Sequence, residues 1–223
     1  MWEIPPRENG EFVANMEDIL DLYQQPYDSD VPLVCMDEKP VQLLEDIREP
    51  ILAQKGKPRR VDNEYKRNGT ASVFMFTEPM GGWRHVSVRE RRTAVDWAYE
   101  IRELLEEYYP GVKRVCLVID NLNIHKIGSL YEAFPPEKAR ELAKRLEIHY
   151  TPKHGSWLNI AEVEISALSR QCLKERIGDI ETLRQEAQAW ERNRNELQKG
   201  VDWRFTSNDA RIRLKRLYPQ IQL

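Results

Sequence analysis

Two aspartates stand where a sheet would present carboxylates to a cation. Asp37 ends the apolar run VPLVCM, and Asp120 ends the run VCLVI. Apolar, β-branched runs of this length predict buried strands. Side chains at the C-terminal ends of such strands converge outside one edge of the sheet, and carboxylate oxygens are hard donors for divalent cations. For either aspartate alone, a helix cap or a surface group is the competing interpretation.

A third acid, Glu162, lies in a predicted helix in which Leu158, Ile165 and Cys172 recur at a spacing of seven. At about 100° per residue, Glu162 falls about 40° from this apolar stripe and Glu164 about 120° from it. We therefore expect Glu162 on the core side of the helix. A carboxylate there needs a partner, which is either a cation shared with the two aspartates or a nearby Arg or Lys.

Hydrophobic periodicity predicts the elements that must position these acids. The order is strand, strand, strand, helix, strand, helix, strand, helix, which predicts an α/β fold with a mixed sheet and helical crossovers. A lead-in helix precedes this series and two further helices follow it, and the segment from Val41 to Leu52 is expected to be partly helical. The predicted strands cover 31–37, 70–79, 83–90, 113–120 and 147–151, and the predicted helices cover 12–23, 92–109, 135–146, 158–172, 180–190 and 210–217.

Composition narrows the class of protein. The chain of 223 residues is 41% hydrophobic and 32% charged, as in a soluble globular protein. The net charge of −3 hides an acidic first fifty residues and a basic remainder, and the latter is compatible with a polyanionic partner. No apolar run approaches the roughly 18 residues of a membrane span, and the N-terminus has no signal-like apolar stretch. We expect a cytoplasmic protein without a membrane partner.

Two other kinds of site are not expected. The cysteines Cys35, Cys116 and Cys172 form no CxxC pair, and the four histidines lack zinc-finger spacing, so we expect buried, reduced thiols and no structural zinc. The stretch VCLVIDN resembles a magnesium-binding strand of a nucleotide hydrolase. However, the chain contains no GxxxxGK[ST] sequence, which argues against a nucleotide partner.

The three acids, the DNLNIH stretch that begins at Asp120 and the WLNIAE stretch that ends at Glu162 together resemble DDE transposases of the mariner superfamily, in its bacterial insertion-sequence branch. The similarity continues through RNGTASVFMF and HGSWLNIAEVE to the closing WRFTSNDARIRLKRLYP. The separation of the last two acids is longer than in eukaryotic mariner members. The Lys39-Pro40 pair after the first acid also departs from the family pattern.

The resemblance implies a ribonuclease H-like fold, with a five-stranded mixed sheet flanked by helices and a helical C-terminal extension. It implies that Asp37, Asp120 and Glu162 are catalytic and bind two divalent cations, Mg²⁺ or its substitute Mn²⁺. Such a site cleaves DNA and joins a freed 3′-hydroxyl to target DNA by in-line displacement. The implied partners are transposon ends and target DNA, bound by a homodimer near the bacterial nucleoid. Asn121 and His125 could orient ligands or serve only the loop.

A basic segment between two predicted strands is the expected contact for the DNA backbone. We expect it to be a loop near Asp37, and a solvated linker is the alternative. The residues Lys153 and His154 precede the Glu162 helix, whose first N–H groups can meet a phosphate. The cations of the basic segment are Lys55, Lys57, Arg59, Arg60, Lys66 and Arg67.

The expected organisation has three parts: a linker helix in residues 1–29, a catalytic core in 30–176 and a helical extension in 177–223. The helix-turn-helix modules with which the family recognises transposon ends have no counterpart in this sequence. A catalytically silent remnant that only binds DNA or partner subunits is therefore the alternative function.

Overall fold

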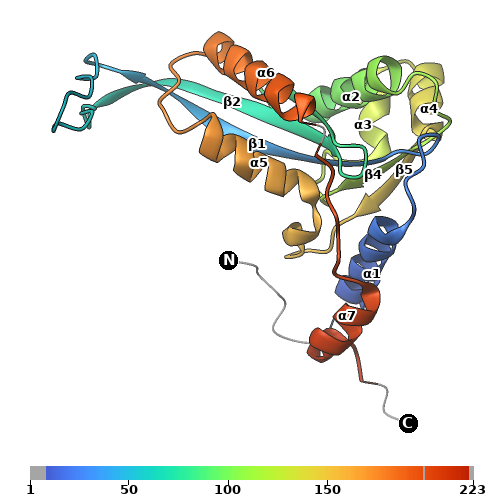
Figure 1. Ribbon diagram of the computed structural model, residues 1–223. Coiled ribbons are helices and arrows are strands. Elements are labelled where there is room, and N and C mark those ends of the chain that lie inside the picture. The colour runs from blue at the N-terminus through green and yellow to red at the C-terminus, as the bar shows by residue number, and fades with distance from the viewer. Residues whose placement is uncertain (1–8, 198, 221–223) are drawn as a thin grey trace.

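The computed structural model describes residues 9–197 and 199–220, and its centre is one mixed sheet with helices on both faces (Figure 1). The strand order is β3-β2-β1-β4-β5, antiparallel among β1, β2 and β3 and parallel from β1 through β4 to β5. The strands are β1 (Leu33–Asp46), β2 (Tyr65–Glu78), β3 (Trp83–Arg89), β4 (Val115–Ile119) and β5 (Leu146–Tyr150). The helices are α1 (Gly10–Gln24), α2 (Ala94–Glu103), α3 (Ile127–Ala133), α4 (Pro136–Lys144), α5 (Ile160–Gln171), α6 (Ile180–Glu196) and α7 (Ser207–Arg213).

The predicted fold class and order of elements are confirmed, with one addition. The short helix α3 lies where a loop was expected, and it carries part of the long separation between Asp120 and Glu162. Residues 1–8 of the expected linker part and 221–223 of the expected extension lie outside the described residues. No helix in the described ranges is long and apolar enough to cross a bilayer.

Two hydrophobic cores lie on opposite faces of the sheet because alternate residues of a strand point to opposite sides. Cys35 and Met75 face the core formed with α1, α5, α6 and α7. Met36 and Phe74 face the core formed with α2, α3 and α4. Each fully buried side chain of this size contributes roughly 1.5–3 kcal/mol. The sheet is thus anchored on both faces, which fixes the positions from which acids can project.

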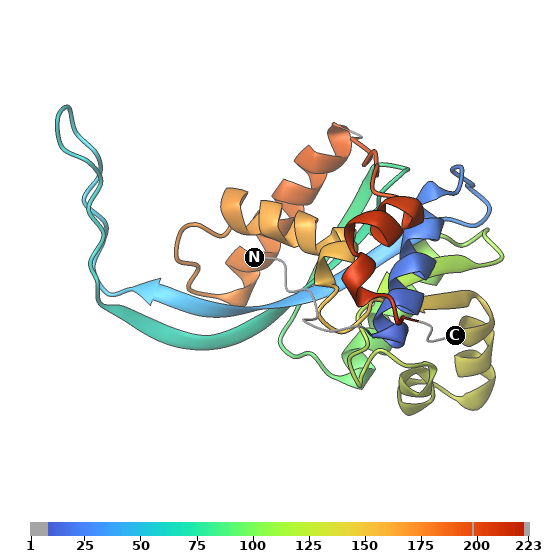
Figure 2. The same ribbon diagram turned by 90° about the horizontal axis from the view of Figure 1, so that it is seen from below.

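A long hairpin of β1 and β2 leaves the body of the protein (Figures 1 and 2). The expected helical character of Val41 to Leu52 is wrong, since β1 continues to Asp46 and pairs with β2 down to Tyr65. The ladder with β2 continues through this segment with one bulge between Gln42 and Leu44, and this pairing overrides the weak local preference of the residues.

The basic segment lies at the far end of this hairpin, so its expected place near Asp37 is also wrong. Asp46 lies nine positions beyond Asp37 along β1, which is about 30 Å at the usual rise of a strand. Four of its cations lie in the connection beyond the strand ends, and Lys66 and Arg67 are part of β2.

Candidate active site

The three predicted acids come from three different elements. Asp37 lies inside β1 rather than at its end, just beyond Cys35, where the pairing of β1 with β4 stops. Asp120 directly follows β4. Glu162 lies in the first turn of α5. The absence of a β4 partner beside Asp37 leaves room for the other two acids at the same corner of the sheet.

Asn159 holds the start of α5 against β1. Its side-chain oxygen accepts the backbone N–H of Ala161 at 3.1 Å, and its amide nitrogen donates to the carbonyl of Met36 at 2.8 Å. Asn159 is only 1% exposed. One amide therefore caps the helix that carries Glu162 and fixes it to the residue before Asp37.

We expect Asn159→Ala to lower both the stability of the protein and the rate of DNA cleavage, although Asn159 is not one of the three acids. The substitution removes a helix cap and leaves the Met36 carbonyl buried without its donor, at a cost of about 2–4 kcal/mol. Urea unfolding measures the loss, and the DNA-cleavage rate should fall with it. An alanine variant with unchanged stability and rate would contradict this role.

The three carboxylates influence one another electrostatically. Burial raises the pKa of Asp37 to about 7, helped by the negative charges of Glu38, Glu162 and Asp120 and opposed by a hydrogen bond from the Glu38 N–H. Burial and the charge of Asp120 also raise the pKa of Glu162, against a hydrogen bond from Ser156. The acids therefore lie close enough for each to oppose the ionisation of the next.

No protein cation compensates Asp37 or Glu162 in the part of the chain that the structure describes. Lys39 follows Asp37 closely in sequence, but its ammonium group donates to the hydroxyl of Ser169 at 2.7 Å. Half-buried carboxylates without a counter-charge are costly, and oxygen ligands of this type suit Mg²⁺ or Mn²⁺. The residues present therefore fit a divalent metal. The oxygens of Asp37, Asp120 and Glu162 do not all lie within 4.8 Å of one another. Among the described residues, the one set of three possible metal ligands that meets this distance lies elsewhere in the protein.

A buried chain of charged groups supports Asp120 from behind. His125 is fully buried and bonds the Asp120 carboxylate through Nδ1 at 2.5 Å, while its Nε2 lies 3.2 Å from Glu38. Arg92 reaches the other oxygen of Glu38 at 3.1 Å. Burial lowers the pKa of His125, but the hydrogen bond to Asp120 and the nearby carboxylate of Glu38 outweigh it and raise the pKa to about 9.

This chain also explains why Asp120 differs from the other two acids. Burial alone would raise the pKa of Asp120, but the hydrogen bond and charge of His125, the Leu122 N–H and Arg92 together lower it. Asp120 is therefore ionised and held in one orientation. Sequence reasoning left the role of His125 open and missed Glu38 and Arg92, whose only signal was a second acid directly after Asp37.

The helical-wheel prediction for α5 is wrong, because Glu164 is the more deeply buried of its two glutamates. It is 3% exposed and pairs with Arg84 at 3.1 Å and Arg194 at 2.8 Å, whereas Glu162 is only half-buried. Both faces of α5 are covered, because β1 and β2 lie against one side, α6 packs against the helix, and Arg84 of β3 reaches Glu164. The buried glutamate is thus structural, and the half-buried one faces the other acids.

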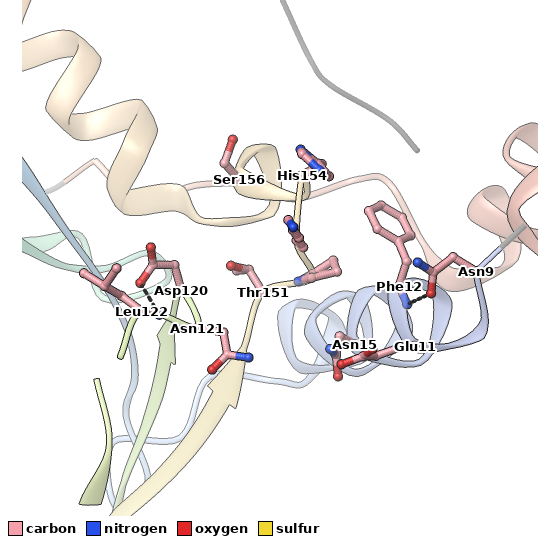
Figure 3. A pocket seen from close by; sticks show the side chains of 12 residues that line it. Asn9, Glu11, Phe12, Asn15, Asp120, Asn121, Leu122, Thr151, His154 and Ser156 are labelled. Carbon is pink, nitrogen blue, oxygen red and sulfur yellow. Dashed lines mark hydrogen bonds between the residues drawn. The ribbon is translucent and has the colours of Figure 1, made fainter. Parts of the chain in front are cut away.

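A hollow of about 530 Å³ opens beside Asp120 and contains Lys153, His154 and Ser156 (Figure 3). A second hollow of about 330 Å³ is lined by Asp37 and Glu162. The Ser156 hydroxyl bonds Glu162 and so connects the two. The backbone of His154 has φ 66°, an uncommon value outside glycine that often marks a functional loop.

Comparison with known proteins identifies the family and the fold of this chain. A family model described as DDE superfamily endonuclease matches residues 32–184 of this chain. No curated protein matches the sequence. Among solved structures, the catalytic domain of Mos1 mariner transposase is similar with a TM-score of 0.55 and 12% identity, over 85% of each chain.

Complexes of Mos1 are also similar. The mariner Mos1 paired end complex with Mn has a TM-score of 0.57 and 16% identity over 86% of this chain, and the complex with Mg has 0.56 and 14% over 98%. This chain corresponds to 56% of the length of the first and 66% of the second. At such identities the likeness shows a shared ribonuclease H-like fold. Because the family model covers most of the sequence and all three acids, the chain belongs to the DDE superfamily endonucleases.

Proposed function

We propose that this chain is the catalytic part of a DDE transposase that cleaves DNA strands and transfers them to target DNA. The observation that carries the proposal is that Asp37 and Glu162 have no protein counter-charge within the described residues and lie close enough to Asp120 for their pKa values to be raised by its charge. The assignment of these three residues as catalytic metal ligands is part of the proposal. The Mos1 complexes with Mn and Mg support divalent metal dependence.

The three carboxylates do not offer three oxygens within 4.8 Å of one another, which favours two ions over one. Asp37, Asp120 and Glu162 would hold the cations, whose charge would activate the attacking oxygen and stabilise the leaving oxygen of a phosphodiester. The chain's own residues orient the reaction. His125 holds the carboxylate of Asp120, Ser156 bonds Glu162, and Lys153 lies in the adjoining hollow, where its charge suits a DNA phosphate.

The test is nicking of a short duplex with a pre-melted end in the presence of Mg²⁺ or Mn²⁺. We expect cleavage that requires the metal and is lost in Asp120→Asn. Glu132→Gln, which changes an exposed acid on α3, is the matched control and should cleave normally. DNA binding without cleavage at any metal concentration would instead indicate the silent remnant.

The DNA backbone contact is proposed at the hairpin tip and beside the hollow. Arg59 pairs with Glu175 and Lys66 with Glu45, which reduces their availability. The other proposed contacts are Lys55, Lys57, Arg60, Arg67, Lys153 and His154. The distance of the tip from the acids suits contact with DNA well away from the cleaved bond.

We expect the triple replacement of Lys55, Lys57 and Arg60 by alanine to weaken DNA binding in a salt-dependent way. Each lost phosphate contact lowers the slope of log K against log salt by about 0.9, so a fall of about 2–3 is expected. Fluorescence anisotropy over a salt series measures it. Alanine at Lys113, Arg140 and Lys144, which are exposed on the body of the protein, should leave the slope almost unchanged. Equal slopes in both triple variants would remove the hairpin from the interface.

A homodimer that holds two transposon ends is the proposed working assembly, and the paired-end complexes of Mos1 support it by analogy. The proposed division into a linker of residues 1–29, a core of 30–176 and an extension of 177–223 follows the order of the elements. The proposed location is the bacterial nucleoid, where the DNA substrate would lie.

A further inference from the structure

A compact set of metal-binding side chains lies away from the three acids, between α1 and the parallel strands β4 and β5. Cys116, Glu147 and His149 each offer one donor atom, and these atoms all lie within 4.8 Å of one another. It is the one set of this kind among residues 9–197 and 199–220. The three residues belong to two paired strands, in which Cys116 is the register partner of Glu147.

The distances between the donors suit a single ion. One donor atom from each residue belongs to a set within 4.8 Å, and the two neighbours of Glu147 approach its two oxygens, Cys116 Sγ at 3.8 Å from Oε2 and His149 Nε2 at 3.5 Å from Oε1. Ligands about 2.0–2.3 Å from a tetrahedral zinc ion are about 3.3–3.8 Å apart, so small side-chain shifts would bring the three donors to that spacing. A thiolate, an imidazole and a carboxylate are together typical ligands of Zn²⁺ and less suited to Mg²⁺.

His149 has one ring nitrogen available to bind a metal. Its Nδ1 donates to the Asp18 carboxylate of α1 at 2.7 Å, which leaves Nε2 as the atom with the lone pair. That Nε2 is buried and makes no hydrogen bond. It faces the Glu147 oxygen, so two acceptors oppose each other unless a cation lies between them. A carboxylate behind a histidine is also the usual support of a metal ligand.

Arg114 leaves the proposed position open. Its Nε contacts Oε2 of Glu147 at 2.7 Å, which is not the oxygen that faces His149. Arg114 is half-exposed and approaches Glu147 as an outer partner. It therefore neutralises part of the carboxylate charge at Oε2, which also faces Cys116, and Oε1 remains the oxygen directed at His149.

We propose that Cys116, Glu147 and His149 bind one zinc ion, with Asp18 orienting His149 and water in the fourth position. The ion would join β4 to β5 beside α1. Because β5 leads into the segment that carries Lys153, His154 and Ser156, the zinc would stabilise the support of the active-site hollow without taking part in the chemistry. Spacing along the sequence did not indicate this site, since strand pairing brings its members together.

The test is zinc stoichiometry of the full chain after dialysis against micromolar free Zn²⁺, measured by elemental analysis. We expect one zinc per chain and a higher melting temperature, both lost in Cys116→Ser and His149→Ala. Cys172→Ser, at a half-buried cysteine elsewhere, and Asp120→Asn should both retain the ion. Asp18→Asn should weaken zinc binding about 10–100-fold. Zinc retained in Cys116→Ser, or absent from the unmodified chain, would overturn the proposal.

A second measurement avoids variants that fail to fold. The Cys172→Ser variant keeps two cysteines, Cys35 and Cys116. Because Cys35 is completely buried, the slow reaction of this variant with a thiol reagent reports on Cys116. We expect Zn²⁺ to slow this reaction at least 10-fold and Mg²⁺ to leave it unchanged. A rate that does not respond to zinc would mean that a proton, not a metal, lies between His149 and Glu147.

Discussion

Glutamine at position 162 is expected to abolish DNA cleavage and preserve the fold, whereas glutamine at position 164 is expected to unfold the protein. The two glutamates are two residues apart on α5 but meet opposite environments. Glu162 has no cation beside it in the described part of the chain, while Glu164 lies between two arginines. The pair separates a catalytic carboxylate from a structural one within a single helix.

The magnitudes follow from what each substitution leaves behind. Loss of Glu162 removes a ligand from a site that must stabilise developing charge, which costs roughly 10³-fold in rate. Loss of the Glu164 charge leaves Arg84, 2% exposed, without its buried partner. Breaking a buried ion pair on one side costs about 3–5 kcal/mol, a large share of the stability of a domain.

Cleavage assays with Mg²⁺ and urea unfolding without metal, both on the two variants, provide the measurement. Glu162→Gln should keep its unfolding midpoint, and Glu164→Gln should lose much of it while any folded fraction still cleaves DNA. Arg194→Met is a useful control, because it leaves Glu164 paired with Arg84 and should cost less. Similar stabilities for the two glutamine variants would contradict the assignment.

Asparagine at position 37 is expected to stabilise the metal-free protein above neutral pH. Burial, with the charge of three nearby acids, raises the pKa of Asp37 from 3.8 to about 7. Ionisation is therefore harder in the folded state than in the unfolded state. The resulting penalty is absent below pH 3.8, grows as the pH rises towards about 7 and is complete above it. Asparagine avoids the penalty and can still accept the Glu38 N–H.

The expected gain is about 2–4 kcal/mol at pH 8 and close to zero at pH 4. Urea unfolding across this pH range in the presence of a chelator measures it. Mg²⁺ should stabilise the unmodified protein but not Asp37→Asn, since the cation compensates the charge that asparagine lacks. Asp30→Asn, at an exposed position, should show neither effect. An Asp37→Asn variant that is less stable at every pH would mean that the carboxylate is structural.

Local patterns determined much of the fold before any contact was known. The apolar runs before Asp37 and Asp120 predict strands, and the helix that carries Glu162 follows from the spacing of its apolar residues. These features depend on side-chain periodicity within a few residues, which the sequence displays directly. The nature and order of the elements could therefore be predicted, as could the three candidate acids.

What surrounds each carboxylate depended on the tertiary structure. Glu164 is neutralised by Arg84, which lies eighty positions earlier in the chain, and His125 joins Glu38 to Asp120 across neighbouring strands. The continuation of β1 beyond Asp37 likewise depends on its pairing with β2. Ion pairs and strand ladders join residues that are distant in sequence, and their energies depend on burial. The sequence by itself therefore determined the elements and the candidate acids, and only the folded structure decided which carboxylates have a protein partner and which donors from different strands lie together.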